Sequence, residues 1–133
     1  MNDLELEEAY HKTRYIVADI ILCVDKTNAQ LDDLLIKNNC TTYAFITAHN
    51  PLSKLLSENE NKILHEQLIS FIKKSEFNYL EGYGEGTGGW PNETSLLILG
   101  MRKEEAIACG VKFNQKAIIF GQLRGAASLI MIQ

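Results

Sequence analysis

The segment from Thr42 to Ala48 constrains the fold more than any other part of the chain. Its residues, Thr-Tyr-Ala-Phe-Ile-Thr-Ala, are continuously apolar or β-branched. A short run of this kind is typical of a strand that is covered on both faces. Asn50-Pro51 follows, and this dipeptide favours a turn because proline cannot donate a further ladder hydrogen bond. We therefore expect a sheet with helices packed against it.

The strongest helical pattern covers residues 57–74. Ser57 and Glu60 have the spacing of a capping box, in which the serine caps the helix and the glutamate reaches back to the cap residue. Lys73 and Lys74 at the other end interact favourably with the helix dipole. An apolar stripe predicts the buried face of this helix, and it consists of Leu64, Leu68, Phe71 and Ile72.

Two shorter helices are also predicted. Asn28 is placed to cap a helix that ends at Asn38-Asn39. A second covers residues 102–109, and Gly110 is expected to end it as a C-cap residue. Residues 1–13 are acidic and have only a weak apolar stripe, so we expect a frayed or helical N-terminal segment.

The remaining apolar runs predict strands. They occupy residues 15–24, 77–80, 94–99, 117–120 and 128–132, and the first is either one bent strand or a tight hairpin. We expect a single domain over residues 1–133. The predicted class is α/β, with α+β as the alternative, and the sheet is mixed, with about five to six strands and about three helices.

Composition excludes several classes of function. The 133-residue chain has a net charge of −4, which argues against binding through nucleic-acid phosphates or anionic lipid surfaces. Its three cysteines are widely spaced, and its histidines lack metal-ligand spacing, so neither disulfides nor a metal site is expected. The N-terminus lacks the apolar core of a signal peptide, and no apolar run approaches the roughly 18 residues of a transmembrane helix. We expect a cytoplasmic protein, and no cofactor is indicated.

A glycine-rich segment at residues 81–91 is predicted to be a loop. It contains the letters of a dinucleotide-binding motif, but no helix follows, so it is either a mobile lid or a plain hairpin connection. Trp90 within it either pins the loop to the core or stacks on a ligand. Glu81 and Glu93 flank it, and they either share acid–base chemistry or are ordinary surface carboxylates.

Polar residues also gather after the central strand and on the long helix. Thr47, Asn50 and Ser53 lie where a ligand could bind at a strand end, although a purely local turn explains them equally well. Asn61 and His65 are four residues apart, so both are expected to point partly inward from the helix. They either help to hold an anion at the helix N-terminus or form a polar pair at the boundary of the core.

Six stretches together resemble a known family. They are Ala44-Phe-Ile-Thr-Ala-His-Asn-Pro51 with Ser53 shortly after it, Glu60-Asn61, Glu81-Gly-x-Gly84, Trp90, Glu93-x-Ser95-Leu-Leu-Ile-Leu-Gly100 and Phe113-x-Gln115-x-Ala-Ile-Ile119. Over residues 14–120 the chain resembles the bacterial domain-of-unknown-function family 3293, which comprises small proteins without an assigned activity. The resemblance adds Ser95 and supports Gln115 as site residues. It departs at His49, where the family carries an aromatic residue, so His49 is expected to pack rather than to catalyse.

Three functions fit these expectations. The first is binding of a small polar ligand, such as a nucleotide or another metabolite, in a pocket between the 47–53 turn, the start of the 57–74 helix and the 81–93 loop. The second is a small hydrolase or transferase that uses Glu81 or Glu93 at the same site. The third is a protein–protein interaction module without a pocket.

Overall fold

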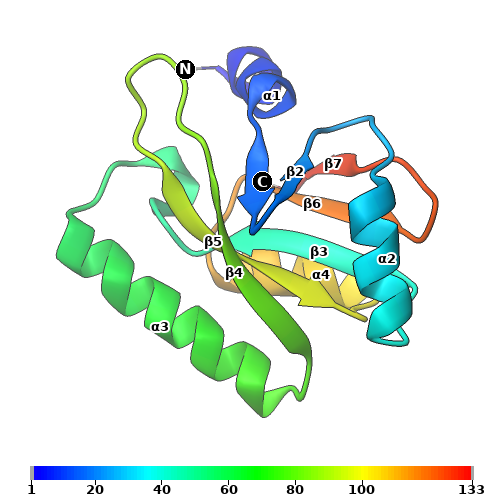
Figure 1. The fold of residues 1–133 in the computed structure, drawn as a ribbon. Helices are drawn as coiled ribbons and strands as arrows, with labels where there is room; N and C mark the ends of the chain where they lie inside the picture. The colour runs from blue at the N-terminus through cyan, green and yellow to red at the C-terminus, as the bar shows by residue number, and fades with distance from the viewer. Residues whose placement is uncertain (1, 133) are drawn as a thin grey trace.

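A computed structural model describes residues 2–132 of the chain. Its helices and strands form one body around a single sheet (Figure 1). In chain order the elements are α1 (Asp3–Lys12), β1 (Tyr15–Val17), β2 (Ile20–Leu22), α2 (Ala29–Lys37), β3 (Thr42–Thr47), a 3-10 turn η1 (Pro51–Ser53), α3 (Glu58–Lys74), β4 (Asn78–Gly84), β5 (Glu93–Leu99), α4 (Lys103–Lys112), β6 (Ala117–Gln122) and β7 (Ser128–Met131).

The sheet has seven strands in the order β2-β1-β4-β5-β3-β6-β7. The mixed α/β class is confirmed, but the expected mixed sheet is wrong, because every pair of neighbouring strands is antiparallel. The helices α3 and α4 do connect parallel strands, as an alternating pattern predicts. In each case one antiparallel strand lies between the two that the helix connects. The described chain also has one strand and one α-helix more than expected.

The sheet curls until its two edge strands meet. Val24, just beyond β2, forms a bridge with Ala127, just before β7. The Asp25 N–H donates to the Ala127 carbonyl at 2.8 Å, and the Ala127 N–H donates to the Lys26 carbonyl at 3.0 Å. The curl gives the sheet an inner and an outer face.

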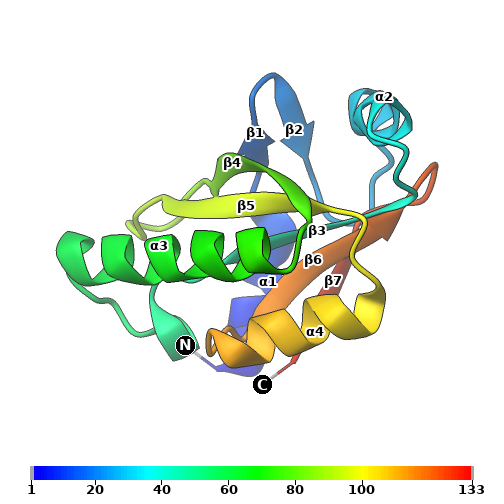
Figure 2. The ribbon, with the colours of Figure 1, turned by 90° about the horizontal axis from the view of Figure 1, so that it is seen from below.

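The two faces of the sheet have separate apolar cores. On the outer face, Ile46, Leu96 and Ile98 pack with residues of α3 and α4. On the inner face, Phe45 and Leu97 pack with residues of α2, β1 and β2. Figure 2 shows α3 and α4 on one side of the sheet and α2 on the other. Because β3 is covered on both sides, its continuous apolar sequence is explained.

Local helix signals are confirmed. The side chain of Ser57 accepts a hydrogen bond from the Glu60 N–H, and the Glu60 side chain accepts one from the Ser57 N–H. Asn28 caps α2 by accepting from the Leu31 N–H. Of the two alternatives expected for residues 15–24, the structure has the hairpin, formed by β1 and β2.

Two glycine-based predictions are wrong. The segment 81–84 belongs to strand β4 rather than to a loop. Gly82 is needed there because a Cβ atom would lie 2.3 Å from the carbonyl oxygen of Ile16 on β1. Gly110 does not end α4, which continues to Lys112. A Cβ at Gly110 would lie 2.5 Å from the Ile132 side chain, so this glycine allows close packing instead of capping the helix.

Candidate functional site

A cavity of about 320 Å³ opens at one end of the inner face. Helix α1 lies on one side of it, and the loop between β4 and β5 lies on another (Figure 1). The ends of β3 and β6 and the turn after β3 complete the wall. Six of the seven predicted ligand-binding residues line it, namely Thr47, Asn50, Ser53, Trp90, Ser95 and Gln115.

Glu93 is a carboxylate of the cavity wall that two other site residues contact. Its Oε2 atom accepts hydrogen bonds from Asn50 Nδ2 at 2.7 Å and from Trp90 Nε1 at 3.2 Å. Burial raises the pKa of Glu93 above its ordinary value, and the bonds from Asn50 and Trp90 partly oppose this shift. Since both bonds use Oε2, Oε1 of Glu93 remains for another partner.

Asn50 holds the turn and Glu93 together. It is buried, and it adopts a left-handed conformation (φ 48°) that asparagine tolerates better than most residues. Its Oδ1 atom accepts from the Leu56 N–H and from Asn61 Nδ2, each at 2.9 Å. Asn61 Oδ1 in turn accepts from the Asn50 N–H at 2.8 Å. Asn61 therefore lies behind Asn50 and supports it, and it does not line the cavity.

The other predicted residues fix the strand ends around the cavity. Thr47 donates to the Thr94 carbonyl at 2.8 Å and accepts from the His49 N–H at 3.0 Å. Ser95 donates to the Glu93 carbonyl at 2.9 Å. Gln115 Nε2 donates to the His49 carbonyl at 3.1 Å, which joins the start of β6 to the turn after β3. These bonds hold the turn in place and so preorganise the cavity wall.

Glu81 does not share this site. Residues 81 and 93 lie on adjacent strands, but their registers place Glu81 opposite Leu96 of the outer core and Glu93 opposite Gly84 of the cavity. Side chains alternate between the two faces along a strand. The two carboxylates therefore point to opposite sides of the sheet, and they cannot act as an acid–base pair on one substrate.

On the outer face, Glu81 pairs with His65 of α3. The distance from His65 Nε2 to Glu81 Oε1 is 2.5 Å. The His49 ring meets the His65 ring edge to face at a centroid distance of 6.1 Å, so His49 packs as expected. Burial, followed by the nearby His65, lowers the pKa of His49. The inward orientation of Asn61 and His65 is confirmed, since both are 7% exposed.

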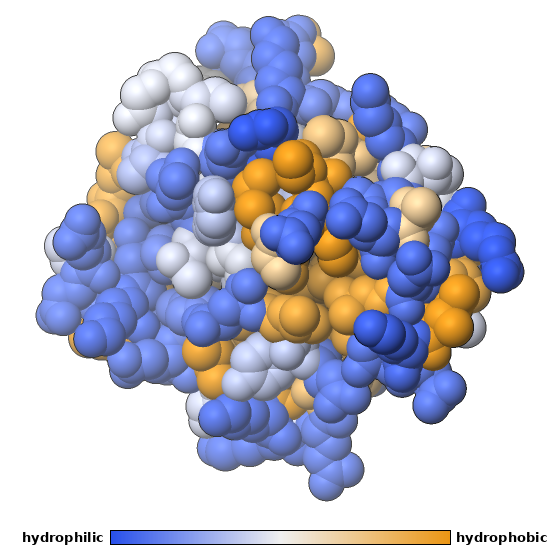
Figure 3. Space-filling model, viewed as in Figure 1, coloured by the Kyte–Doolittle hydropathy of each residue, from blue (hydrophilic) through white to orange (hydrophobic). Residues whose placement is uncertain are grey.

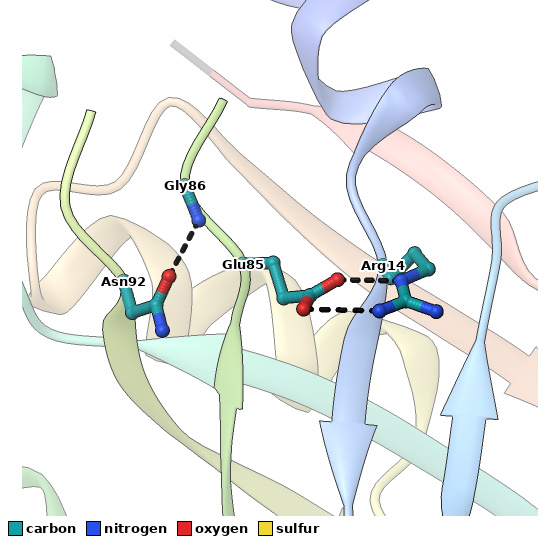
Figure 4. Close-up of polar contacts among 4 residues, drawn as sticks. All are labelled: Arg14, Glu85, Gly86 and Asn92. Carbon is teal, nitrogen blue, oxygen red and sulfur yellow. Dashed lines mark hydrogen bonds and ion pairs between the residues drawn. The ribbon is translucent and has the colours of Figure 1, made fainter. Parts of the chain in front are cut away.

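The loop between β4 and β5 is held at its base (Figure 4). The Gly86 N–H donates to Asn92 Oδ1 at 2.9 Å, and Arg14 donates to both carboxylate oxygens of Glu85, at 2.5 and 3.1 Å. A Cβ on Gly86 would lie 1.6 Å from the Trp90 carbonyl oxygen, so only glycine allows this approach. The loop thereby places Trp90 against Glu93, which means that Trp90 both anchors the loop and lines the cavity.

Sequence reasoning missed the contribution of α1. Leu6, Ala9, Tyr10 and Thr13 line the cavity, and they are the half-buried residues of this segment. Tyr15 Oη donates to the Tyr10 carbonyl at 3.1 Å, and burial raises the pKa of Tyr10. The weak apolar stripe of residues 1–13 was the available signal. It is weak because this helix covers a cavity and buries no residue completely.

Two further features bear on the type of site. Among residues 2–132 no group of three or more His, Cys, Asp and Glu side chains is arranged to hold a metal ion. In the same part of the chain no helix has the length and apolar character required to cross a membrane. The polar groups of the described lining are the carboxylates of Asp3, Glu85 and Glu93, the amine of Lys116, and several hydroxyl and amide side chains.

The comparisons with known proteins give a family but no described relative. No curated protein and no solved structure matches the chain. The family model described as "Protein of unknown function (DUF3293)" matches residues 46–118. This range is more than half of the chain, and it includes Asn50, Asn61, Trp90, Glu93 and Gln115 but not α1. The chain therefore belongs to the DUF3293 family.

Proposed function

We propose that this protein binds a small organic molecule in the cavity between α1, the turn after β3 and the loop between β4 and β5. One observation carries the proposal: residues from separate parts of the sequence converge on one cavity of about 320 Å³. This volume is within the range of small-molecule sites. The pocket expected from the sequence had the start of α3 as one of its walls. In the structure, α1 and the start of β6 form that part of the wall instead.

The lining indicates a ligand with an apolar body and a polar end. Phe45, Ile119 and Leu129 form an apolar wall, and Glu93, Ser53 and Thr47 present polar groups. Binding sites of this kind commonly combine an apolar surface with a few polar groups that fix the orientation of the ligand. Trp90 offers an aromatic surface and reports on its surroundings as the only tryptophan of the chain.

A thermal-shift screen with metabolite and nucleotide libraries tests the proposal, with Trp90 fluorescence as the second readout. A ligand at about 100 times its Kd should stabilise the fold by roughly 2.7 kcal/mol. The matched variants are Ala9→Phe, which adds a ring to the cavity side of α1, and Glu8→Phe, which adds the same ring to its exposed side.

Ala9→Phe should abolish the shift, whereas Glu8→Phe should retain it. Circular dichroism checks that α1 remains helical in both variants. Equal binding to Ala9→Phe and to the wild type would place the ligand elsewhere on the molecule and would reject the proposal.

A surface feature favours a second candidate, contact with a protein. Figure 3 shows apolar side chains gathered at the centre of the face that is seen in Figure 1. Ile21 of β2 and Ile36 of α2 are 45% and 52% exposed. Exposed apolar surface is a common mark of protein contacts. Light scattering of the wild type and of Ile21→Lys over a range of concentrations tests for self-association through β2.

A further inference from the structure

Among residues 2–132, Glu93 has hydrogen-bond donors but no cationic partner. Its Oε2 atom is engaged by Asn50 and Trp90. None of the ion pairs found among residues 2–132 includes it. Lys116 also lines the cavity, but it forms no ion pair with Glu93. A carboxylate that is withdrawn from water is stabilised by a paired cation, and the part of the chain that the structure describes does not supply one.

The surroundings of Glu93 also suit a cation. Two further carboxylates, of Asp3 and Glu85, line the cavity, whereas Lys116 is the one basic residue of the described lining. Arg14, which holds Glu85, is not part of that lining. Several aromatic rings surround the space, and the face of an aromatic ring attracts cations. These rings belong to Tyr10, Tyr15, Phe45 and Trp90.

We propose that the ligand of this cavity is an organic cation, a protonated amine on an apolar body, whose nitrogen binds Oε1 of Glu93. This inference rests on the function proposed above and names its ligand class. The Asn50 and Trp90 bonds orient the carboxylate so that Oε1 is available, and the apolar wall receives the remainder of the molecule. Burial disfavours the charged form of Glu93, and a bound cation would offset that penalty.

Three probes that share one ring system but differ in charge test the inference: phenethylamine, 2-phenylethanol and 3-phenylpropionate. Each is titrated into the wild type, and the single indole N–H resonance of Trp90 is followed by NMR. We expect the amine to bind about ten times more tightly than the alcohol, because a charge-assisted hydrogen bond is roughly twice as strong as a neutral one. The carboxylate should bind most weakly.

Glu93→Gln is the decisive variant, and Glu81→Gln, on the outer face of the same hairpin, is its matched control. Glutamine keeps an oxygen that can accept from Asn50 and Trp90, but it presents a neutral amide to the cavity. The preference for amine over alcohol should disappear in Glu93→Gln and persist in Glu81→Gln. If Glu93→Gln does not fold, the ranking of the three probes on the wild type still decides the question.

The outcomes separate this inference from the proposed function. Binding of the alcohol or the carboxylate as tightly as the amine would overturn the cationic ligand and leave a small-molecule site in place. An amine preference that survives Glu93→Gln would also overturn it. Failure of all three probes to bind at millimolar concentration would reject the cationic ligand, and the library screen would then decide the proposed function separately.

Discussion

Glu81 and Glu93 lie on adjacent strands of one hairpin, yet their environments differ in every respect. Glu81 is on the outer face, where its side chain is 58% exposed and pairs with His65. Glu93 is on the inner face, where it is partly buried, accepts two hydrogen bonds and lines a cavity. The pKa of Glu93 is raised by burial.

This difference follows from strand geometry. A strand sends successive side chains to opposite faces, so two residues on paired strands share a face only if their registers agree. Residue type therefore says little about the role of a carboxylate in a hairpin. The register of its strand against the neighbouring strand decides which face the carboxylate occupies. Glu81 lies on the face with solvent and a helix, and Glu93 lies on the face with the cavity.

Asn50→Asp should break the inner-face arrangement most severely. Aspartate tolerates the left-handed backbone and keeps an acceptor for Asn61 and Leu56, but it replaces the donor to Glu93 by a second carboxylate. We expect a loss of about 3 kcal/mol in unfolding free energy at neutral pH, measured by urea denaturation. Because like charges favour protonation, the loss should shrink as the pH is lowered. An equal loss at pH 4.5 and pH 7.5 would contradict the contact with Glu93.

Gly86→Ala should separate Trp90 from Glu93 without touching the outer face. The added Cβ cannot fit against the Trp90 carbonyl, so the loop must move, at a cost of about 2 kcal/mol. Gly88→Ala is the control, since a Cβ there meets no atom within 4 Å and only its positive φ causes strain, at about 1 kcal/mol. Trp90 emission should change in Gly86→Ala alone. The same change in both variants would mean that Trp90 does not depend on the base of the loop.

The pH dependence of stability should next reveal the burial of Glu93. A carboxyl group with a raised pKa in the folded state binds its proton more tightly there than in the unfolded chain. Its contribution to the free energy of unfolding is therefore complete below its unfolded pKa near 4.5, and this contribution is lost as pH rises through its folded pKa. Glu93→Gln should remove this part of the dependence of unfolding free energy on pH. The stability of the variant relative to wild type should therefore improve from pH 4 to pH 8. Tyr10 and Tyr15 also face this region, but their raised pKa values keep them uncharged over that range.

Glu81→Gln provides the comparison for that pH series. Because Glu81 points to the opposite face of the sheet, this variant should leave Trp90 emission unchanged at each pH of the series, whereas Glu93→Gln replaces the carboxylate that accepts from the indole N–H and should alter it. An equal change in Trp90 emission in both variants would show that the two groups do not lie in separate environments.

The smallest effect is expected for the coupling between His65 and Glu81. A double-mutant cycle with His65→Ala and Glu81→Ala isolates their interaction from the packing lost at His65. Since Glu81 is 58% exposed, solvent screens the pair, and the coupling should stay below about 1 kcal/mol. A coupling of several kcal/mol would mean that the outer-face pair is as essential as the network around Glu93.

The sequence predicted the parts of the structure that depend on near neighbours. The capping box of Ser57 and Glu60 and the cap at Asn28 were confirmed, since each involves residues three positions apart. The cluster of polar residues after β3 was also found, because a strand end is recognisable from its own apolar run and the proline that follows. Six of the seven predicted ligand-binding residues meet at one cavity for this reason.

The parts that failed depend on distant neighbours. Gly82 and Gly110 were interpreted as loop and cap residues, but each makes room for a side chain or backbone far away in the sequence. The separation of Glu81 from Glu93 follows from the register of β4 against β5, which the misplaced loop obscured. Likewise, the weak apolar stripe of residues 1–13 indicates a helix with one partly buried face, but it does not indicate which distant residues that face covers.

The bridge between Val24 and Ala127 affects how the protein folds and how it avoids aggregation. Unpaired sheet edges are templates on which other chains can add strands, and here part of each edge is engaged by the other. The same contact joins residues that are distant in sequence, so it adds to the contact order of the fold. Chains rich in such contacts fold slowly, because a long loop must close before the pairing stabilises it. Protection of the edges is therefore achieved late, and the period before the sheet closes is the one in which this protein is most exposed to association with other chains.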